Sequence, residues 1–287
     1  IIQPTVGWVS IAVVLACYWI LLRRQLEAPF ADMRSGLFVA MAEWAAMKVK
    51  QLPPKQERAW KPNVLVPVEE AGELRGELQV LENLIRPHGM AKVFGLERGD
   101  RDDGFSETLS DLALGLQDRG VFTDWTIIRS DGFAEGLTAG MQALRGAFFR
   151  PNITFLRMPD TRKRAEEYRR IIAAADDLGV GTMIYAPHPT AGLGQRAHLN
   201  VWVRDRSPDW RISWDIGNLD LSILSAYKLA RNWDASLRLV MVVDEPSQRP
   251  EAREFLTDLT ELARLPETEI VVRAGQTHSG RSFALER

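Results

Sequence analysis

The chain has 287 residues, of which 46% are hydrophobic and 26% are charged, as in ordinary globular proteins and unlike disordered ones. Its net charge of −2 provides no general attraction for nucleic acid, so we expect no nucleic-acid partner. The only cysteine, Cys17, lies in an apolar N-terminal segment, so the rest of the chain can form neither a disulfide nor a thiolate metal site.

Residues 1–24 are predicted to be a transmembrane helix. No charged residue occurs in Ile1–Leu22, and roughly 20 apolar residues are enough to cross a bilayer core. Trp8 and Trp19 lie towards its two ends, as interfacial aromatic residues do. The arginine pair that follows predicts that the chain after residue 24 is on the cytoplasmic side of the cell membrane.

A signal peptide and a buried core helix are the alternatives for this segment. A signal peptide has its basic residues first and a small-residue cleavage site last, whereas here the basic pair comes last. The 17 uncharged residues of Val6–Leu22 form a longer apolar segment than a core helix usually has. We therefore expect contact with the lipid bilayer through residues 1–24.

Residues 25–55 are predicted to form an amphipathic connecting helix and a linker that contains Pro53 and Pro54. Large apolar side chains recur there every three or four residues, on one side of a helix. This stripe is either an interface with a second subunit or the membrane bundle, or a face that packs on its own soluble domain. The residues of the predicted dimer or docking interface are Phe30, Met33, Leu37, Met41 and Trp44.

From residue 56 onward, strand patterns alternate with helix patterns, which predicts an α/β fold with mostly parallel sheets flanked by helices. We expect a first subdomain over 56–190 and a second over 191–287, divided at a glycine- and proline-rich loop. The predicted strands are Asn63–Val68, Ala91–Leu96, Trp125–Ile128, Asn152–Leu156, Gly181–Ala186, Leu199–Val203, Trp210–Trp214, Leu237–Val243 and Glu269–Val272. The predicted helices are Leu74–Ile85, Phe105–Gln117, Phe133–Phe149, Thr161–Leu178, Leu219–Asn232 and Pro250–Leu265.

The sequence contains no recognisable catalytic or metal-binding motif. No GxGxxG follows a predicted strand, and P-loop, GxSxG and HExxH motifs are absent. Carboxylates such as Glu69 and Asp160 follow predicted strands, where acid–base catalysis or Mg²⁺ binding occurs, but such residues also cap helices and fill solvated turns. We predict no enzyme activity, no catalytic residue and no metal.

Three further patterns have both a functional and a structural interpretation. Gly192 and Gly194 are the best candidates for a nucleotide-binding loop, although a flexible loop between subdomains needs such residues in any case. Arg157–Arg170 is rich in basic residues, but its i,i+4 charge pairs indicate a solvated helix face. Gly136 and Gly140 form a GxxxG pattern that indicates close packing of a soluble helix.

Several stretches resemble the end of a cation–chloride cotransporter, namely the last membrane helix and the cytosolic C-terminal domain. Asp32–Gly36 (DMRSG), followed by an apolar helix, resembles the segment that leads into the family's "scissor" helix. The stretches that resemble family motifs, in order, are Trp60–Val66 (WKPNVLV), Phe149–Leu156 (FRPNITFL), Asn200–Val203 (NVWV), Leu219–Leu229 with Trp233, and Leu237–Val243. Asp220–Leu224 (DLSIL) replaces the family's glycine-led run, and the short loops indicate a prokaryotic-type member.

The resemblance implies two subdomains like universal stress proteins, preceded by a transmembrane helix and a scissor-type helix. It implies a cytosolic regulatory and dimerisation domain of a secondary active transporter that moves Cl⁻ electroneutrally with Na⁺ and/or K⁺. Its partners would be its own transmembrane bundle and a second copy. The family's ion sites lie in membrane helices outside this chain, so no ion-binding residue is carried over. The alternative is a singly anchored α/β nucleotide-binding sensor or enzyme.

Overall fold

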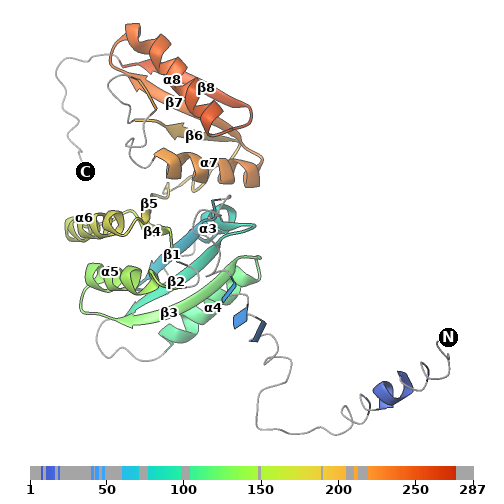
Figure 1. Ribbon diagram of the computed structural model, residues 1–287. Helices are drawn as coiled ribbons and strands as arrows, with labels where there is room; N and C mark the ends of the chain where they lie inside the picture. The colour runs from blue at the N-terminus through green and yellow to red at the C-terminus, as the bar shows by residue number, and fades with distance from the viewer. Residues whose placement is uncertain are drawn as a thin grey trace. The chain divides into compact units, whose positions relative to one another are not determined.

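The computed structural model describes residues 8, 11–16, 19, 40–41, 43–44, 47–48, 60–70, 77–97, 104–147, 150–188, 190–204, 210–212 and 219–275. The chain divides into two compact units, Ile1–Arg58 and Ala59–Arg287, which we describe separately (Figure 1).

The described residues of the first unit are helical. Met41 and Trp44, from the predicted interface stripe, are 58% and 61% exposed, while Phe30, Met33 and Leu37 lie outside the described residues. Within the part of the chain that the structure describes, no helix combines the length and apolar character that crossing a bilayer requires.

The second unit begins with a five-stranded parallel sheet in the order β3-β2-β1-β4-β5. Its strands are β1 (Asn63–Val68), β2 (Met90–Glu97), β3 (Phe122–Arg129), β4 (Ile153–Arg157) and β5 (Gly181–Tyr185). The apolar side chains of β1, β2 and β4 are buried on both faces, as central parallel strands require. This confirms the predicted α/β class.

Two Pro-Asn pairs hold the starts of β1 and β4 together. Asn152 Oδ1 accepts a hydrogen bond from the Asn63 amide at 2.9 Å, and its Nδ2 donates to the Lys61 carbonyl at 2.8 Å. Asn63 Nδ2 donates in turn to the Arg150 carbonyl at 3.1 Å. The motifs WKPN and FRPN therefore fix two strands that are nearly 90 residues apart in sequence beside each other.

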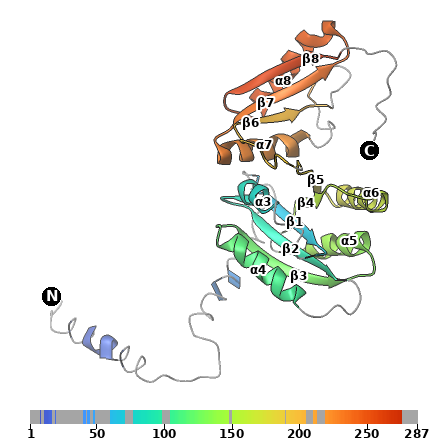
Figure 2. The ribbon, with the colours of Figure 1, turned by 180° about the vertical axis from the view of Figure 1, so that it is seen from behind.

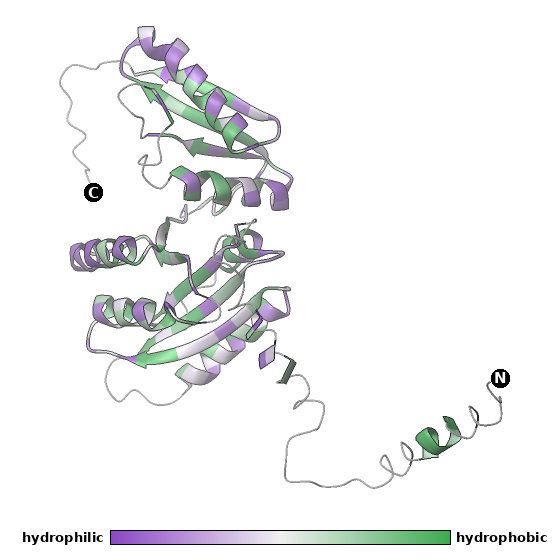
Figure 3. Ribbon diagram, in the orientation of Figure 1, coloured by the Kyte–Doolittle hydropathy of each residue, from purple (hydrophilic) through white to green (hydrophobic). Residues whose placement is uncertain are grey.

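Helices cover both faces of this sheet (Figures 1 and 2). α3 (Leu78–Ile85) and α4 (Phe105–Gln117) share one hydrophobic core with β1 and β2. α5 (Phe133–Leu144) and α6 (Arg162–Asp177) share another core on the opposite face. The sheet is therefore doubly wound, with apolar strands between amphipathic helices whose polar sides face outward (Figure 3).

The GxxxG pattern brings α5 close to the sheet. A Cβ at Gly140 would lie 2.1 Å from Phe94 Cζ, and one at Gly136 would lie 2.7 Å from Leu96 Cδ2. Only hydrogen fits at these two positions, so the structure confirms close packing of a soluble helix.

The second sheet is parallel, in the order β6-β7-β8. Its elements are β6 (His198–Trp202), α7 (Leu219–Trp233), β7 (Ser236–Val243), a short 3₁₀ turn (Pro246–Gln248), α8 (Arg249–Leu262) and β8 (Thr268–Ala274). Alternate side chains of β7, such as Leu239 and Met241, pack with α7 and α8 in one core. On the other side of the strands, Trp202 and Val242 are exposed.

Helix α7 joins the two sheets within this unit. Ile223, Ala226 and Ala230 belong to the core of the second sheet, whereas Leu221 and Leu229 pack against the core of the first. α7 also contacts α3. Gly181 leaves room for Leu221, because a Cβ there would lie 2.6 Å from Leu221 Cδ2.

The prediction of a strand at Trp210–Trp214 is wrong over its described residues, Trp210–Ile212, which are not in a strand. Trp210 has a φ of 56°, which is incompatible with extended backbone. Its ring lies edge-on to Phe255, with centroids 6.3 Å apart, so it packs on the second core from an irregular segment.

Candidate functional site

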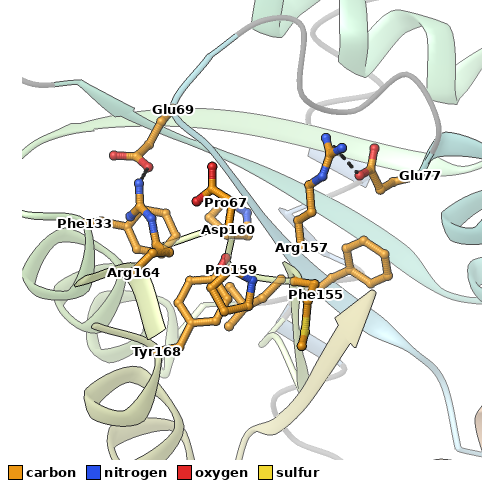
Figure 4. Close-up of a pocket in the computed structure, with 12 residues that line it drawn as sticks. Pro67, Glu69, Glu77, Phe133, Phe155, Arg157, Pro159, Asp160, Arg164 and Tyr168 are labelled. Atoms are coloured by element: carbon orange, nitrogen blue, oxygen red, sulfur yellow. Dashed lines mark hydrogen bonds and ion pairs between the residues drawn. The ribbon is translucent and has the colours of Figure 1, made fainter. Parts of the chain in front are cut away.

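A cavity of about 410 Å³ opens at the carboxyl ends of β1 and β4 (Figure 4). These two strands are neighbours, and the chain winds outward from them in opposite directions, so this is the switch point where doubly wound sheets bind ligands. The walls come from the ends of β1 and β4, the start of α5, the first turns of α6 and the residue before α3. The lining residues are Pro67, Glu69, Glu77, Phe133, Phe155, Leu156, Arg157, Met158, Pro159, Asp160, Arg164 and Tyr168.

Arg164 connects three walls of this cavity. Its Nη2 pairs with Glu69 at the end of β1 (Figure 4). Its Nη1 lies 2.9 Å from Glu167 Oε2. Its guanidinium carbon lies 4.2 Å from the ring centroid of Phe133, which stacks on Tyr168 at 6.0 Å. The α6 turn that carries Arg164 is fixed by Thr161, whose Oγ1 accepts the Arg164 amide hydrogen bond at 3.2 Å.

A second ion pair lies across the cavity. Arg157 Nη1 is 3.6 Å from Oε1 of Glu77, whose side chain is only 3% exposed (Figure 4). The other carboxylate oxygen, Oε2, is buried without a hydrogen-bond partner among the described residues. Burial raises the pKa of nearby Tyr185, Glu77 adds to the rise, and Arg157 opposes it.

The charges of the cavity largely bind one another. Three carboxylates and two guanidinium groups line it, and each guanidinium already has a carboxylate partner. A phosphate would have to displace those carboxylates, and leaving a buried carboxylate without its partner costs free energy. The cavity is therefore not a preformed anion site.

Replacing Arg164 with methionine is expected to lower the free energy of unfolding by about 2 kcal/mol. The change removes the positive charge shared by Glu69 and Glu167; a fully buried pair would lose ~3–5 kcal/mol, but the Arg164 side chain is 24% exposed. Urea unfolding followed by circular dichroism measures the change. The control is Arg169→Met on the same helix, whose pair with Glu166 lies in solvent, and it should have little effect. Equal effects of both substitutions would contradict the structural role of Arg164.

The structure separates the residues singled out from the sequence. Glu69 and Asp160 line the switch-point cavity, as their positions after predicted strands indicated. Gly192 and Gly194 lie after β5 with φ of 53° and 59°, and neither lines this cavity. His188 Nδ1 accepts a hydrogen bond from the Ala191 amide at 3.0 Å, so the loop that contains the two glycines begins with a tight turn. The nucleotide loop remains a prediction.

Comparison with known proteins identifies the family. The family model for the first part of the C-terminal domain of prokaryotic cation–chloride cotransporters matches residues 66–193, and the model for the second part matches residues 194–283. The cytoplasmic domain of a prokaryotic cation chloride cotransporter is 41% identical, covers 78% of this chain and 84% of its own, and superposes with a TM-score of 0.67.

The chain belongs to the prokaryotic cation–chloride cotransporter family. Residues 66–283 are therefore its C-terminal domain, and the resemblance seen in the sequence is confirmed.

A more distant structure shares the fold of this cotransporter domain. A Pseudomonas aeruginosa protein described as functionally unknown is 17% identical, with a TM-score of 0.51, and the match covers 75% of this chain and 74% of that one. A universal stress protein from Archaeoglobus fulgidus is 11% identical, with a TM-score of 0.48, and the match covers 76% and 80%. A comparison with curated protein sequences gave no match.

The sequence did not reveal the arginines of this cotransporter cavity. The sequence of Arg157–Arg170 predicts a solvated face with i,i+4 pairs, but the pairs that the structure shows on α6 are i,i+3, between Arg164 and Glu167 and between Arg169 and Glu166. Arg170 pairs instead with Glu135 on α5. The signal that could have found Arg164 is its position in the first turn of the helix that follows a strand at the switch point.

Proposed function

We propose that residues 66–283 form the cytoplasmic regulatory and dimerisation domain of a secondary active transporter. The transporter moves Cl⁻ with Na⁺ and/or K⁺ without net charge transfer. The observation that supports this best is the consecutive match of both family models over one uninterrupted stretch of chain. The 41% identity to a cytoplasmic domain of the same family supports the location.

The switch-point cavity supports a regulatory role more than a catalytic one. Its arginines are neutralised by carboxylates, and its ion pairs join the ends of β1, α5 and α6. We assign no catalytic residue and no cofactor. A singly anchored nucleotide-binding sensor or enzyme is the competing function, and Gly192 and Gly194 are its candidate loop.

The function is tested by reconstituting the complete transporter in liposomes. We expect Cl⁻ uptake that requires Na⁺ or K⁺ outside and does not change when a membrane potential is imposed, because no net charge moves. Deleting residues 66–283 should alter the rate and leave the requirement for ions unchanged. Uptake that follows the imposed potential would contradict electroneutral cotransport.

We propose that dimerisation uses the stripe of Phe30, Met33, Leu37, Met41 and Trp44. Its two described members, Met41 and Trp44, are large apolar side chains exposed to solvent, as an unoccupied interface requires. The partner is a second copy of the chain, in a contact that pairs the stripe with itself.

Leu37→Glu and Trp44→Glu are each expected to weaken self-association by about tenfold or more, because a charge would be buried in an apolar contact. Light scattering on the purified full-length chain measures the mass against concentration. The control is Ala46→Glu, which adds the same charge on the opposite side of the predicted helix. A mass that stays dimeric in both stripe variants would place the dimer contact elsewhere.

A further inference from the structure

A second cavity of about 650 Å³ lies where α3 meets α7. Its walls come from the residues that lead into β1, the end of α3 with the turn after it, and one side of α7. The residues that line it are Trp60, Lys61, Asn83, Arg86, Pro87, His88, Leu224, Tyr227, Lys228, Arg231 and Asn232. Its size is that of a small-molecule site.

The charged side chains that line this cavity are all positive. Lys61, Arg86, Lys228 and Arg231 line it, and no aspartate or glutamate is among the described residues that do so. Glu82 pairs with Arg86 from the adjacent turn of α3 at 3.2 Å, on a half-exposed arginine side chain. The switch-point cavity, where carboxylates outnumber arginines, has the opposite character.

Helix α7 supplies most of one wall. Its lining residues are spaced by three, one and three positions, which places them on one side of the helix: Leu224, Tyr227, Lys228 and Arg231. Burial lowers the pKa of Lys228, and the neighbouring Arg231 lowers it further, so holding these cations together has an electrostatic cost. A bound anion would relieve that cost.

The geometry of the cavity is held by hydrogen bonds between the two helices. Lys228 Nζ donates to the Ile85 carbonyl at 3.4 Å, and Asn232 Nδ2 donates to the Asn83 and Arg86 carbonyls. Lys228 and Asn232 therefore bind the C-terminal end of α3, and Arg86 and Arg231 line the cavity beside them. Trp60 and Tyr227 add aromatic surface beside these charges.

We propose that this cavity binds a phosphate-bearing ligand, supplied either as a free nucleotide or as the headgroup of an anionic phospholipid. Clustered arginines and lysines form charge-assisted hydrogen bonds to phosphate oxygens, and the two aromatic side chains provide a surface for a base or a glycerol backbone. The ligand would contact α3 of the first sheet and α7 of the second. This site is independent of the proposed transport function, which concerns ions bound elsewhere.

Isothermal titration of the full-length chain tests the proposal with three probes. ATP represents the free nucleotide, dihexanoylphosphatidylglycerol represents an anionic lipid, and dihexanoylphosphatidylcholine is its zwitterionic counterpart. We expect saturable binding of ATP or of the anionic lipid with one site per chain, and weaker binding of the zwitterionic lipid.

Two charge-reversing variants locate the site. Arg231→Glu and Lys61→Glu change two different elements of the cavity wall. Each should weaken binding by about tenfold or more, because it removes a charged hydrogen-bond donor and introduces a negative charge that repels the phosphate. Arg253→Glu, the same change on an exposed position of α8, is the control and should leave affinity unchanged.

The results distinguish a nucleotide from a lipid headgroup, and two of them would overturn the proposed site. Binding of ATP that is lost in Arg231→Glu supports a nucleotide, and binding of only the anionic lipid that is lost in the same variant supports a headgroup. Binding of any probe that Arg231→Glu and Lys61→Glu leave intact would overturn the proposal. The absence of binding by both ATP and the anionic lipid would also overturn it, whatever the transport assay shows.

Discussion

Replacing Phe255 with alanine is expected to lower the free energy of unfolding by about 3–5 kcal/mol. Phe255 lies on α8 in the core of the second sheet, is 1% exposed and meets the ring of Trp210. Truncation to alanine removes buried apolar surface and leaves a cavity. The core of a three-stranded sheet has few neighbouring side chains that could move into it. A loss of this size is a large share of the total stability of a typical domain.

Urea unfolding followed by circular dichroism gives the value for Phe255→Ala. The matched control is Leu262→Ala on the same helix, where the leucine is 64% exposed, and its effect should stay within about 0.5 kcal/mol. A loss below ~1 kcal/mol for Phe255→Ala would show that this side chain is not part of a packed core.

Gly140→Ala is expected to destabilise the protein by about 1–3 kcal/mol, although alanine is the better helix former. The added methyl group would lie 2.1 Å from Phe94 Cζ, and Phe94 on β2 is itself buried, so any movement of its ring is costly. Either α5 moves off the sheet or the ring leaves its rotamer. Thermal unfolding monitored by calorimetry measures the change.

The same substitution at Gly115 on α4 is expected to have the opposite sign. A Cβ there would meet no atom within 4 Å, so only the helix propensity changes and the protein should gain about 0.5–1 kcal/mol. If both alanine variants were stabilised, α5 would not be packed on β2 at the distance described.

The sheets were predictable because the local pattern and the tertiary environment agree. The predicted strand Asn63–Val68 matches β1, and its continuous apolar run is what a strand covered on both faces needs. β3 is longer than its prediction, Trp125–Ile128, because this strand includes polar Thr123 and Asp124 at the edge of the sheet. Helix α5 is shorter than predicted and ends at Leu144.

The cavities were only partly predictable, because their walls depend on strand order and on contacts between helices. Glu69 and Asp160 could be expected near a ligand site from their places after strands. Arg164 could not be paired with Glu69 without knowing that β1 and β4 are neighbours. Likewise, nothing in the periodicity of 219–233 shows that Arg231 and Arg86 share a cavity, since α3 and α7 are remote in sequence.

The family models divide this domain between residues 193 and 194, so helix α7 belongs to the second part. Side chains of α7 nevertheless pack on the core of the first part. Because α7 supplies side chains to the hydrophobic cores of both sheets, separating the halves would expose apolar surface on each of them. Local opening of one half would therefore uncover apolar surface of the other half, and we expect the two halves to unfold as one cooperative unit. The free energy of unfolding of either sheet therefore depends on the presence of the other, although each sheet has its own hydrophobic core.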